Sequence, residues 1–190
     1  MDDAALVRAF VAIDIPNAEC ERAFAVSKRL RKAGVRVSWT PPERMHLTLR
    51  FLGEVAPAVI AGIAERLEPE YAGVEPFPLR LEGAGAFPNA REARVIWVGL
   101  APLAGPLEQV QEAAESAARE AGLKREKRQF RPHLTVGRVR DPKKAGALAA
   151  LIHEERNFSG DEFAVSSVSL YESQLTPSGP IYNRLHEFPF

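Results

Sequence analysis

Two short stretches decide how this chain of 190 residues is organised: His46-Leu-Thr-Leu49 and His133-Leu-Thr-Val136. The chain contains only four histidines, and two of them begin a copy of the same pattern. Each copy has the composition of a β-strand, in which residues two apart point to the same face. Histidine and threonine would therefore share one face of each strand, and the aliphatic residues would face the core. The pattern predicts two strands, each with a functional side and a core side.

The composition indicates a folded protein with a sizeable core, because 46% of the residues are hydrophobic. The formal net charge is zero, from 25 basic and 25 acidic residues, which argues against general coating of nucleic acid. It does not argue against recognition of one small anionic group. Cys20 is the only cysteine, which excludes an intrachain disulfide and a cysteine-rich zinc site. The chain shows no secretory signal and no stretch of 18 apolar residues, so we expect a cytoplasmic protein without a membrane span.

The segments around the two motifs follow the same order, which indicates an internal duplication. The motif histidines are 87 residues apart; Phe77 follows His46 by 31 residues, and Phe163 follows His133 by 30. Each round contains a strand, a helix, the histidine strand, a second helix and two further strands. We therefore expect an α+β fold in which residues 1–190 form a single two-lobed domain of two interleaved, pseudo-twofold halves. Two antiparallel-rich sheets, flanked by helices, would enclose a central cleft.

The expected elements follow from periodicity and from the residues that start and stop helices. Asn17 is a possible cap for the first helix, and Asp141-Pro142 is a typical helix start. The expected strands are Leu6–Ile15, the His46 strand, Phe77–Leu81, Arg94–Leu100, the His133 strand, Phe163–Tyr171 and Ile181–Phe188, and the expected helices are Ala18–Ala33, Pro57–Leu67, Gly105–Ala121 and Asp141–Arg156.

Two imidazoles that converge on one cleft can act as a general acid–base pair near neutral pH. The hydroxyls of Thr48 and Thr135 can donate hydrogen bonds to an anionic oxygen. A phosphodiester suits this set, because its hydrolysis removes one proton, delivers another and needs charge spread over the non-bridging oxygens. The sequence therefore predicts a site made of His46, His133, Thr48 and Thr135.

Basic residues lie close to the second motif. The segment from Lys124 to Arg140 contains seven basic residues and one acid, Glu126. Arg131, two residues before His133, would share the catalytic face if the backbone is extended. Arg50, four residues after His46, would do the same if its strand is regular. Either guanidinium suits bidentate contact with phosphate, although the basic run equally suits a solvated loop.

Histidines in strands often have a purely structural role. A single histidine in an amphipathic strand is more often structural than catalytic, but two copies at matching positions favour function. His153 is expected to be exposed and His186 to be structural. The glycines near Gly83 open no helix, and the chain has neither a Walker loop nor a Gly-x-Ser-x-Gly elbow. Neither motif adds a carboxylate or a second histidine at ligand spacing, so we expect neither a metal nor a cofactor.

With these residues identified, the chain resembles the RNA 2′,3′-cyclic phosphodiesterases, also called 2′-5′ RNA ligases, of the two-histidine phosphoesterase superfamily. The resemblance covers nearly the whole chain. The segments that carry it are Arg8–Pro16 (RAFVAIDIP), Trp39–Gly53 (WTPPERMHLTLRFLG), Arg131–Arg138 (RPHLTVGR), Leu170–Ser173 (LYES) and Gly179–Tyr182 (GPIY).

The resemblance implies hydrolysis of a 2′,3′-cyclic phosphate at an RNA end to a 2′-phosphomonoester. It implies that His46 is the proton donor, that His133 is the proton acceptor, and that Thr48 and Thr135 bind the phosphate with help from Arg131. The residues alone do not distinguish donor from acceptor. Members of the family also join RNA ends through a 2′-5′ linkage without ATP.

Several alternatives remain open from the sequence. A protein that binds RNA ends or nucleotide 2′-phosphates without turnover would carry the same motifs, and a metal-dependent phosphohydrolase is a weaker alternative. The substrate is either RNA with a cyclic phosphate end or a small cyclic nucleotide. Phe87 and Tyr182 are candidates for base stacking, although core packing is the favoured explanation for each. We expect a monomer, because the two-lobed site would be complete in one chain.

Overall fold

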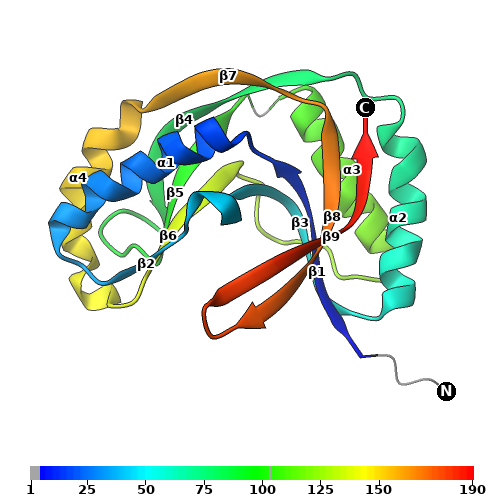
Figure 1. The fold of residues 1–190 in the computed structure, drawn as a ribbon, viewed down its shortest axis with the longest axis horizontal. Helices are drawn as coiled ribbons and strands as arrows, with labels where there is room; N and C mark the ends of the chain where they lie inside the picture. The colour runs from blue at the N-terminus through cyan, green and yellow to red at the C-terminus, as the bar shows by residue number, and fades with distance from the viewer. Residues whose placement is uncertain (1–4, 103) are drawn as a thin grey trace.

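The computed structural model describes residues 5–102 and 104–190. Strands and helices alternate along most of the chain, and a β-hairpin ends it (Figure 1). The strands of the described residues are Val7–Asp14 (β1), Val37–Trp39 (β2), His46–Val55 (β3), Phe77–Phe87 (β4), Val95–Ala101 (β5), His133–Val139 (β6), Ser159–Val165 (β7), Ser167–Thr176 (β8) and Gly179–Pro189 (β9). The α-helices are Asn17–Leu30 (α1), Pro57–Tyr71 (α2), Pro106–Glu120 (α3) and Ala149–Glu154 (α4), and 3₁₀ segments cover Arg31–Ala33, Pro42–Arg44, Pro142–Leu148 and Glu155–Asn157.

The two histidine strands lie side by side in the middle of the sheet. The order of strands is β7-β4-β5-β6-β3-β1-β8-β9, with β2 pairing separately with β6, and every pairing is antiparallel. The strands β3 and β6 pair at one position only, Leu47 with Leu134. The expected α+β architecture is confirmed, and its two antiparallel halves are joined at this one pair into a continuous, curled sheet.

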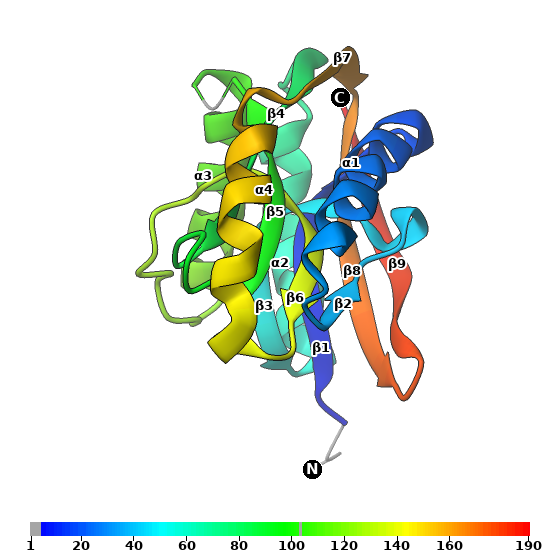
Figure 2. The ribbon, with the colours of Figure 1, turned by 90° about the vertical axis from the view of Figure 1, so that its left-hand side faces the viewer.

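Two helices cover each half of the sheet. The helices α1 and α4 lie against the half that contains β4, β6 and β7, whereas α2 and α3 lie together against the half that contains β3 and β9 (Figures 1 and 2). The helix α1 follows β1 in the chain but packs on the other half, and α3 follows β5 and makes the reverse exchange. Each half of the sheet is therefore covered in part by a helix that follows a strand of the other half.

Apolar spacing explains why α2 and α3 form and where they pack. Ile60, Ile63, Leu67 and Tyr71 recur at helical spacing along α2, and all four are buried. The hydroxyl of Tyr71 donates a hydrogen bond of 2.9 Å to the carbonyl oxygen of Val110 on α3. A buried hydroxyl needs such a partner, so this bond fixes how the two helices sit on the sheet.

One predicted strand is wrong. The segment expected as a single strand, Phe163–Tyr171, is divided at Ser166 between β7, the first strand of the sheet order, and β8, which is next to its last. The strand β7 pairs with β4, and β8 pairs with β1 and β9. No glycine or proline marks the change at Ser166, so local sequence carried no signal for it.

Two predicted helix starts also need correction. Asn17 is the first residue of α1 and makes no capping bond; the carbonyl oxygen of Pro16 accepts the N–H groups of Glu19 and Cys20 instead. The segment after Asp141 is mainly a 3₁₀ helix, followed by the short α4, and the Asp141 side chain caps nothing. Its backbone carbonyl accepts the N–H of Lys144, three residues on, which is the bond of a 3₁₀ turn.

The strand β4 extends past the predicted Leu81 to Phe87. A bulge between Glu82 and Ala84 interrupts its pairing with β5, and Gly83 there has a positive φ of 68°. Glycine adopts this conformation without strain, which lets the strand continue past the bulge. The glycines that superficially resemble a dinucleotide loop therefore belong to a strand. None of the helices in residues 5–102 and 104–190 is long and apolar enough to cross a membrane.

Candidate active site

The pairing of Leu47 with Leu134 places the two motifs beside each other. Both leucines are buried, at 1% and 0% exposure, while the motif histidines and threonines are partly exposed. In an antiparallel pair this register sets His46 across from Thr135 and Thr48 across from His133, all on the face opposite the leucines. The structure therefore brings the four predicted motif residues together.

Both histidine strands carry a bulge at the same place. Between β1 and β3, Ala12 pairs with Thr48 and Val11 with Arg50, so Leu49 is skipped. Between β5 and β6, Trp97 pairs with Thr135 and Ile96 with Gly137, so Val136 is skipped. The skipped residue is the fourth of each motif. A bulge reverses the alternation of faces that follows it, so the residue five positions after each histidine, not four, returns to the face of that histidine.

This bulge corrects the prediction for Arg50. Its side chain is buried, at 8% exposure, and its Nε lies 2.7 Å from a carboxylate oxygen of Glu115. It also donates to the carbonyl oxygens of Phe51 and Lys124. Arg50 lines the wall of the cleft but is occupied by these partners, and it does not share the face of His46 as a regular strand would require.

Aromatic rings enclose His46. Its ring stacks on Phe10 with centroids 4.7 Å apart, and the ring of Tyr182 meets it edge-on at 5.0 Å. Burial lowers the pKa of His46 to about 4. The backbone carbonyl of Arg44 and the charge of Asp14 raise this pKa more weakly, and His133 acts in the same direction as burial. His46 is therefore neutral at pH 7 when the site is empty.

His133 has equivalent surroundings in the other half. The ring of Phe87 meets it edge-on at 5.0 Å, and Trp97 lies at 6.5 Å. Burial and the charge of Arg138 lower its pKa, and a hydrogen bond to the backbone of Arg131 opposes that change. The Nδ1 atom of His133 lies 2.6 Å from the carbonyl oxygen of Arg131. Because a carbonyl only accepts, Nδ1 carries the proton and Nε2 is left as the acceptor.

Phe87 and Tyr182 thus occupy related positions, each against a motif histidine. Core packing and base stacking were both open for these rings. In the structure, each ring makes an edge contact with one motif imidazole and so supports it.

Asp14 is a residue of the site that the sequence analysis missed. It pairs with His46 in the β1–β3 register, which puts the two side chains on the same face. Its carboxylate accepts hydrogen bonds from the hydroxyl of Tyr171 at 2.7 Å and from that of Ser169 at 3.1 Å. These donors hold the carboxylate in place, and its charge raises the pKa of His46. Only the strand register could have revealed this residue.

A cleft of about 1260 Å³ opens from the motifs. Thr48, Thr135, His133 and Arg131 line it, and His46 lies beside it on β3. Arg138, which the bulge turns toward the face of His133, lines it as well. From the sequence, Arg138 was recognisable only as part of a basic run, because the bulge that orients it was not predictable from spacing.

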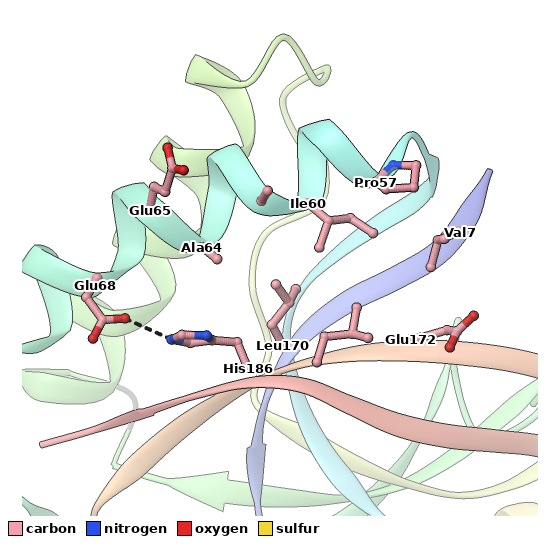
Figure 3. Close-up of a pocket in the computed structure, with 11 residues that line it drawn as sticks. Val7, Pro57, Ile60, Ala64, Glu65, Glu68, Leu170, Glu172 and His186 are labelled. Atoms are coloured by element: carbon pink, nitrogen blue, oxygen red, sulfur yellow. Dashed lines mark hydrogen bonds and ion pairs between the residues drawn. The ribbon is translucent and has the colours of Figure 1, made fainter. Parts of the chain in front are cut away.

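The other two histidines lie elsewhere. His153, on α4, is exposed and bonds Arg156. His186, on β9, lies 2.8 Å from a carboxylate oxygen of Glu68 on α2, in a second, mostly apolar hollow of about 760 Å³ (Figure 3). This contact ties β9 to α2, which agrees with the structural role expected for His186. Among the described residues, no group of three or more His, Cys, Asp or Glu side chains is placed to hold a metal ion.

Comparison with known proteins defines the family. Residues 21–176 match the model of the 2′-5′ RNA ligase superfamily. The chain is 36% identical over 182 residues to the RNA 2′,3′-cyclic phosphodiesterase of Methanothermobacter thermautotrophicus, covering 96% of this chain and 98% of that protein. It is also 36% identical to the protein of the same name from Thermotoga maritima, over 97% of this chain and 96% of the relative.

A solved structure agrees with these relatives. E. coli LigT in complex with 3′-AMP superposes with a TM-score of 0.76 at 26% identity, over 97% of this chain and 98% of LigT. The chain therefore has the α+β fold of LigT, with a curled antiparallel sheet. The chain belongs to the 2′-5′ RNA ligase superfamily, as its motifs predict.

Proposed function

We propose that this protein hydrolyses 2′,3′-cyclic phosphate ends of RNA to 2′-phosphomonoesters, with His46 and His133 as a general acid–base pair and without a metal ion. One observation carries the proposal: the Leu47–Leu134 pair sets both His-x-Thr motifs on one open face. The names of the relatives from M. thermautotrophicus and T. maritima support the substrate.

His133 is suited to the role of proton acceptor. The hydrogen bond from Nδ1 to the carbonyl of Arg131 fixes the tautomer and leaves Nε2 basic. The lowered pKa of His133 favours the neutral ring, which can take a proton from water.

His46 is suited to the role of proton donor once substrate is bound. The apolar surroundings lower its pKa, so a proton held there is readily given up. The negative charges of Asp14 and of a bound phosphodiester both favour the protonated ring before transfer. The roles of the two histidines follow the family assignment, and the asymmetric placement of Asp14 beside His46 supports it.

The reaction then balances as follows. A water oxygen attacks phosphorus and its proton passes to Nε2 of His133, while the bond to the 3′-oxygen breaks and that oxygen takes a proton from His46. Thr48 and Thr135 donate hydrogen bonds to the non-bridging oxygens, and Arg131, with Arg138, offsets the charge that develops there. The product carries a 2′-phosphomonoester and a free 3′-hydroxyl.

The same site can join RNA ends if a 5′-hydroxyl replaces water, because attack by that oxygen gives a 2′-5′ phosphodiester without ATP. All residues of the site come from one chain, so a monomer suffices for either reaction.

The test is incubation of the purified protein with a nucleoside 2′,3′-cyclic phosphate in excess EDTA, with the product identified by ³¹P NMR. We expect the nucleoside 2′-phosphate. Binding without hydrolysis would identify a binding protein instead, and loss of turnover in EDTA that Mg²⁺ or Mn²⁺ restores would identify a metal-dependent phosphohydrolase.

Asp14→Asn is expected to lower kcat/KM at pH 7 about tenfold, because loss of the negative charge disfavours protonation of His46. The asparagine side chain still offers its oxygen to one of the hydroxyls of Tyr171 and Ser169, and its amide group can donate to the oxygen of the other. In the pH profile of kcat/KM, the limb due to His46 should therefore move to lower pH. Asp161→Asn is the matched control, since Asp161 pairs with Arg22 on the surface. An equal loss at every pH would contradict the prediction.

A further inference from the structure

One side of the motif pair carries an additional strand, β2, whose residues do not line the cleft. There β2 pairs with the end of β6, through Val37 with Val139 and Trp39 with Gly137. A Cβ atom on Gly137 would lie 2.7 Å from Cγ1 of Val37. Glycine at this position therefore lets β2 pack tightly against β6.

On the side of β3, no such additional strand is present among residues 5–102 and 104–190. The position on β3 that corresponds to Gly137 is Arg50, the residue after the shared bulge. Its side chain reaches Glu115 on α3 and the carbonyl of Lys124. The segment from Leu123 to Pro132 forms no strand with β3, and the cleft runs between this segment, β3 and α3.

The size of the cleft exceeds what the reacting group needs. Its volume is about 1260 Å³, whereas sites for small molecules typically measure roughly 300–1,000 Å³. A terminal nucleotide with its cyclic phosphate at the histidines would leave the part beside α3 unfilled.

The lining of this cleft is strongly basic although the chain as a whole is neutral. Its charged residues are Arg50, Arg94, Arg119, Arg125, Arg128, Arg131 and Arg138 against Glu112, Glu115 and Glu126. Within residues 5–102 and 104–190, Arg50 is the only one of these arginines with a carboxylate in ion-pair distance. Six guanidinium groups therefore gather around one opening, and such a concentration attracts a polyanion.

We propose that the RNA strand on the 5′ side of the cyclic phosphate leaves the active site through this opening, with its phosphates held by Arg119, Arg125 and Arg128. The proposal rests on the proposed function, because the cyclic phosphate at the histidines fixes which end of the strand enters. A cyclic phosphate marks the 3′ end, so the rest of the strand continues from the 5′ side of that nucleotide. The opening is continuous with the reacting site, which favours the substrate strand over an unrelated polyanion.

Aromatic side chains support a single strand in particular. Phe51 and Phe130 line the cleft, and Phe51 is 39% exposed. One face of the Phe51 ring is covered by the guanidinium of Arg8 at 4.5 Å. An exposed ring beside a basic groove is typical of sites that stack unpaired bases while cations follow the backbone.

The experiment compares a nucleoside 2′,3′-cyclic phosphate with a tetranucleotide that ends in the same group. We expect kcat/KM of the wild type to be at least about tenfold higher for the tetranucleotide, and we expect Arg125→Gln/Arg128→Gln to bring the ratio near one. The slope of log kcat/KM against log salt for the tetranucleotide should become less steep by about 1.4, or about 0.7 per phosphate contact. Lys143→Gln/Lys144→Gln removes the same charge from an exposed segment outside the cleft and should keep the wild-type ratio.

A wild-type ratio near one, or a ratio that the arginine variant leaves unchanged, would overturn the proposal. Failure of the proposed function is distinguishable, because it would abolish turnover of both substrates. In that case, fluorescence anisotropy with a 5′-labelled tetranucleotide 2′-phosphate decides. Weaker binding by Arg125→Gln/Arg128→Gln than by the lysine control supports the strand path, and equal binding overturns it.

Discussion

His46→Ala and His133→Ala are each expected to lower kcat for a nucleoside 2′,3′-cyclic phosphate by about a thousandfold. Each removes one of two proton-transfer groups, and such a group contributes roughly 10²–10⁴-fold in rate. Binding should change much less, because Thr48, Thr135 and the arginines of the cleft remain. Single-turnover measurements with enzyme in excess would separate the chemical step from product release.

The double variant gives a sharper result than either single one. If one proton enters as another leaves, the two rings act as a unit, and the double loss should fall far short of the product of the single losses. His153→Ala is the matched control, since His153 is exposed on α4, remote from the cleft residues. Full activity in either single motif variant would refute the acid–base pair.

The separate roles can be assigned with a substrate that needs no acid. In an aryl phosphodiester such as bis(4-nitrophenyl) phosphate, the leaving oxygen departs without a proton. His46→Ala should be impaired much less on this substrate than on the cyclic nucleotide, whereas His133→Ala should be impaired on both. The reverse pattern would exchange the donor and the acceptor.

The centre of this site was predictable from the sequence because a motif of four residues determines each half of it. Residues two apart on a strand share a face, so His-x-Thr between buried aliphatics places imidazole and hydroxyl together wherever the strand lies. Repetition of the pattern added the second half. The side chains of Leu47 and Leu134 then bring the halves into contact through the core.

The sequence did not predict what depends on the partner strand. The bulges at Leu49 and Val136 arise between paired strands. They turn Arg50 away from the face of His46 and Arg138 toward the face of His133. Asp14 contributes only because the register places it against His46. The crossing at Ser166 from β7 at one end of the sheet to β8 in its other half likewise has no local sequence signal. Periodicity defines the faces within one strand, whereas register and strand order come from long-range packing.

Acidification is expected to destabilise the folded protein through His46. Its pKa in the folded state is about 4, below the ordinary value of 6.5, because the ring lies among Phe10 and Tyr182. Between these two values the unfolded chain binds more protons than the folded protein. The contribution of His46 to stability is therefore complete above about pH 6.5 and is lost as the pH falls toward 4.

The expected loss is about 2–3 kcal/mol between pH 7.5 and pH 4.5, in line with 1.36 kcal/mol for each pKa unit. Urea denaturation of the wild type and of His46→Gln at both pH values would isolate it, because carboxylates that titrate in this range cancel in the comparison. The variant should lose less free energy of unfolding on acidification, by about the same 2–3 kcal/mol, even if it is less stable at pH 7.5. His153→Gln should follow the wild type. An equal pH dependence in the wild type and His46→Gln would mean that the ring accepts a proton without leaving its aromatic surroundings, and the readiness of His46 to give up that proton would then need another cause.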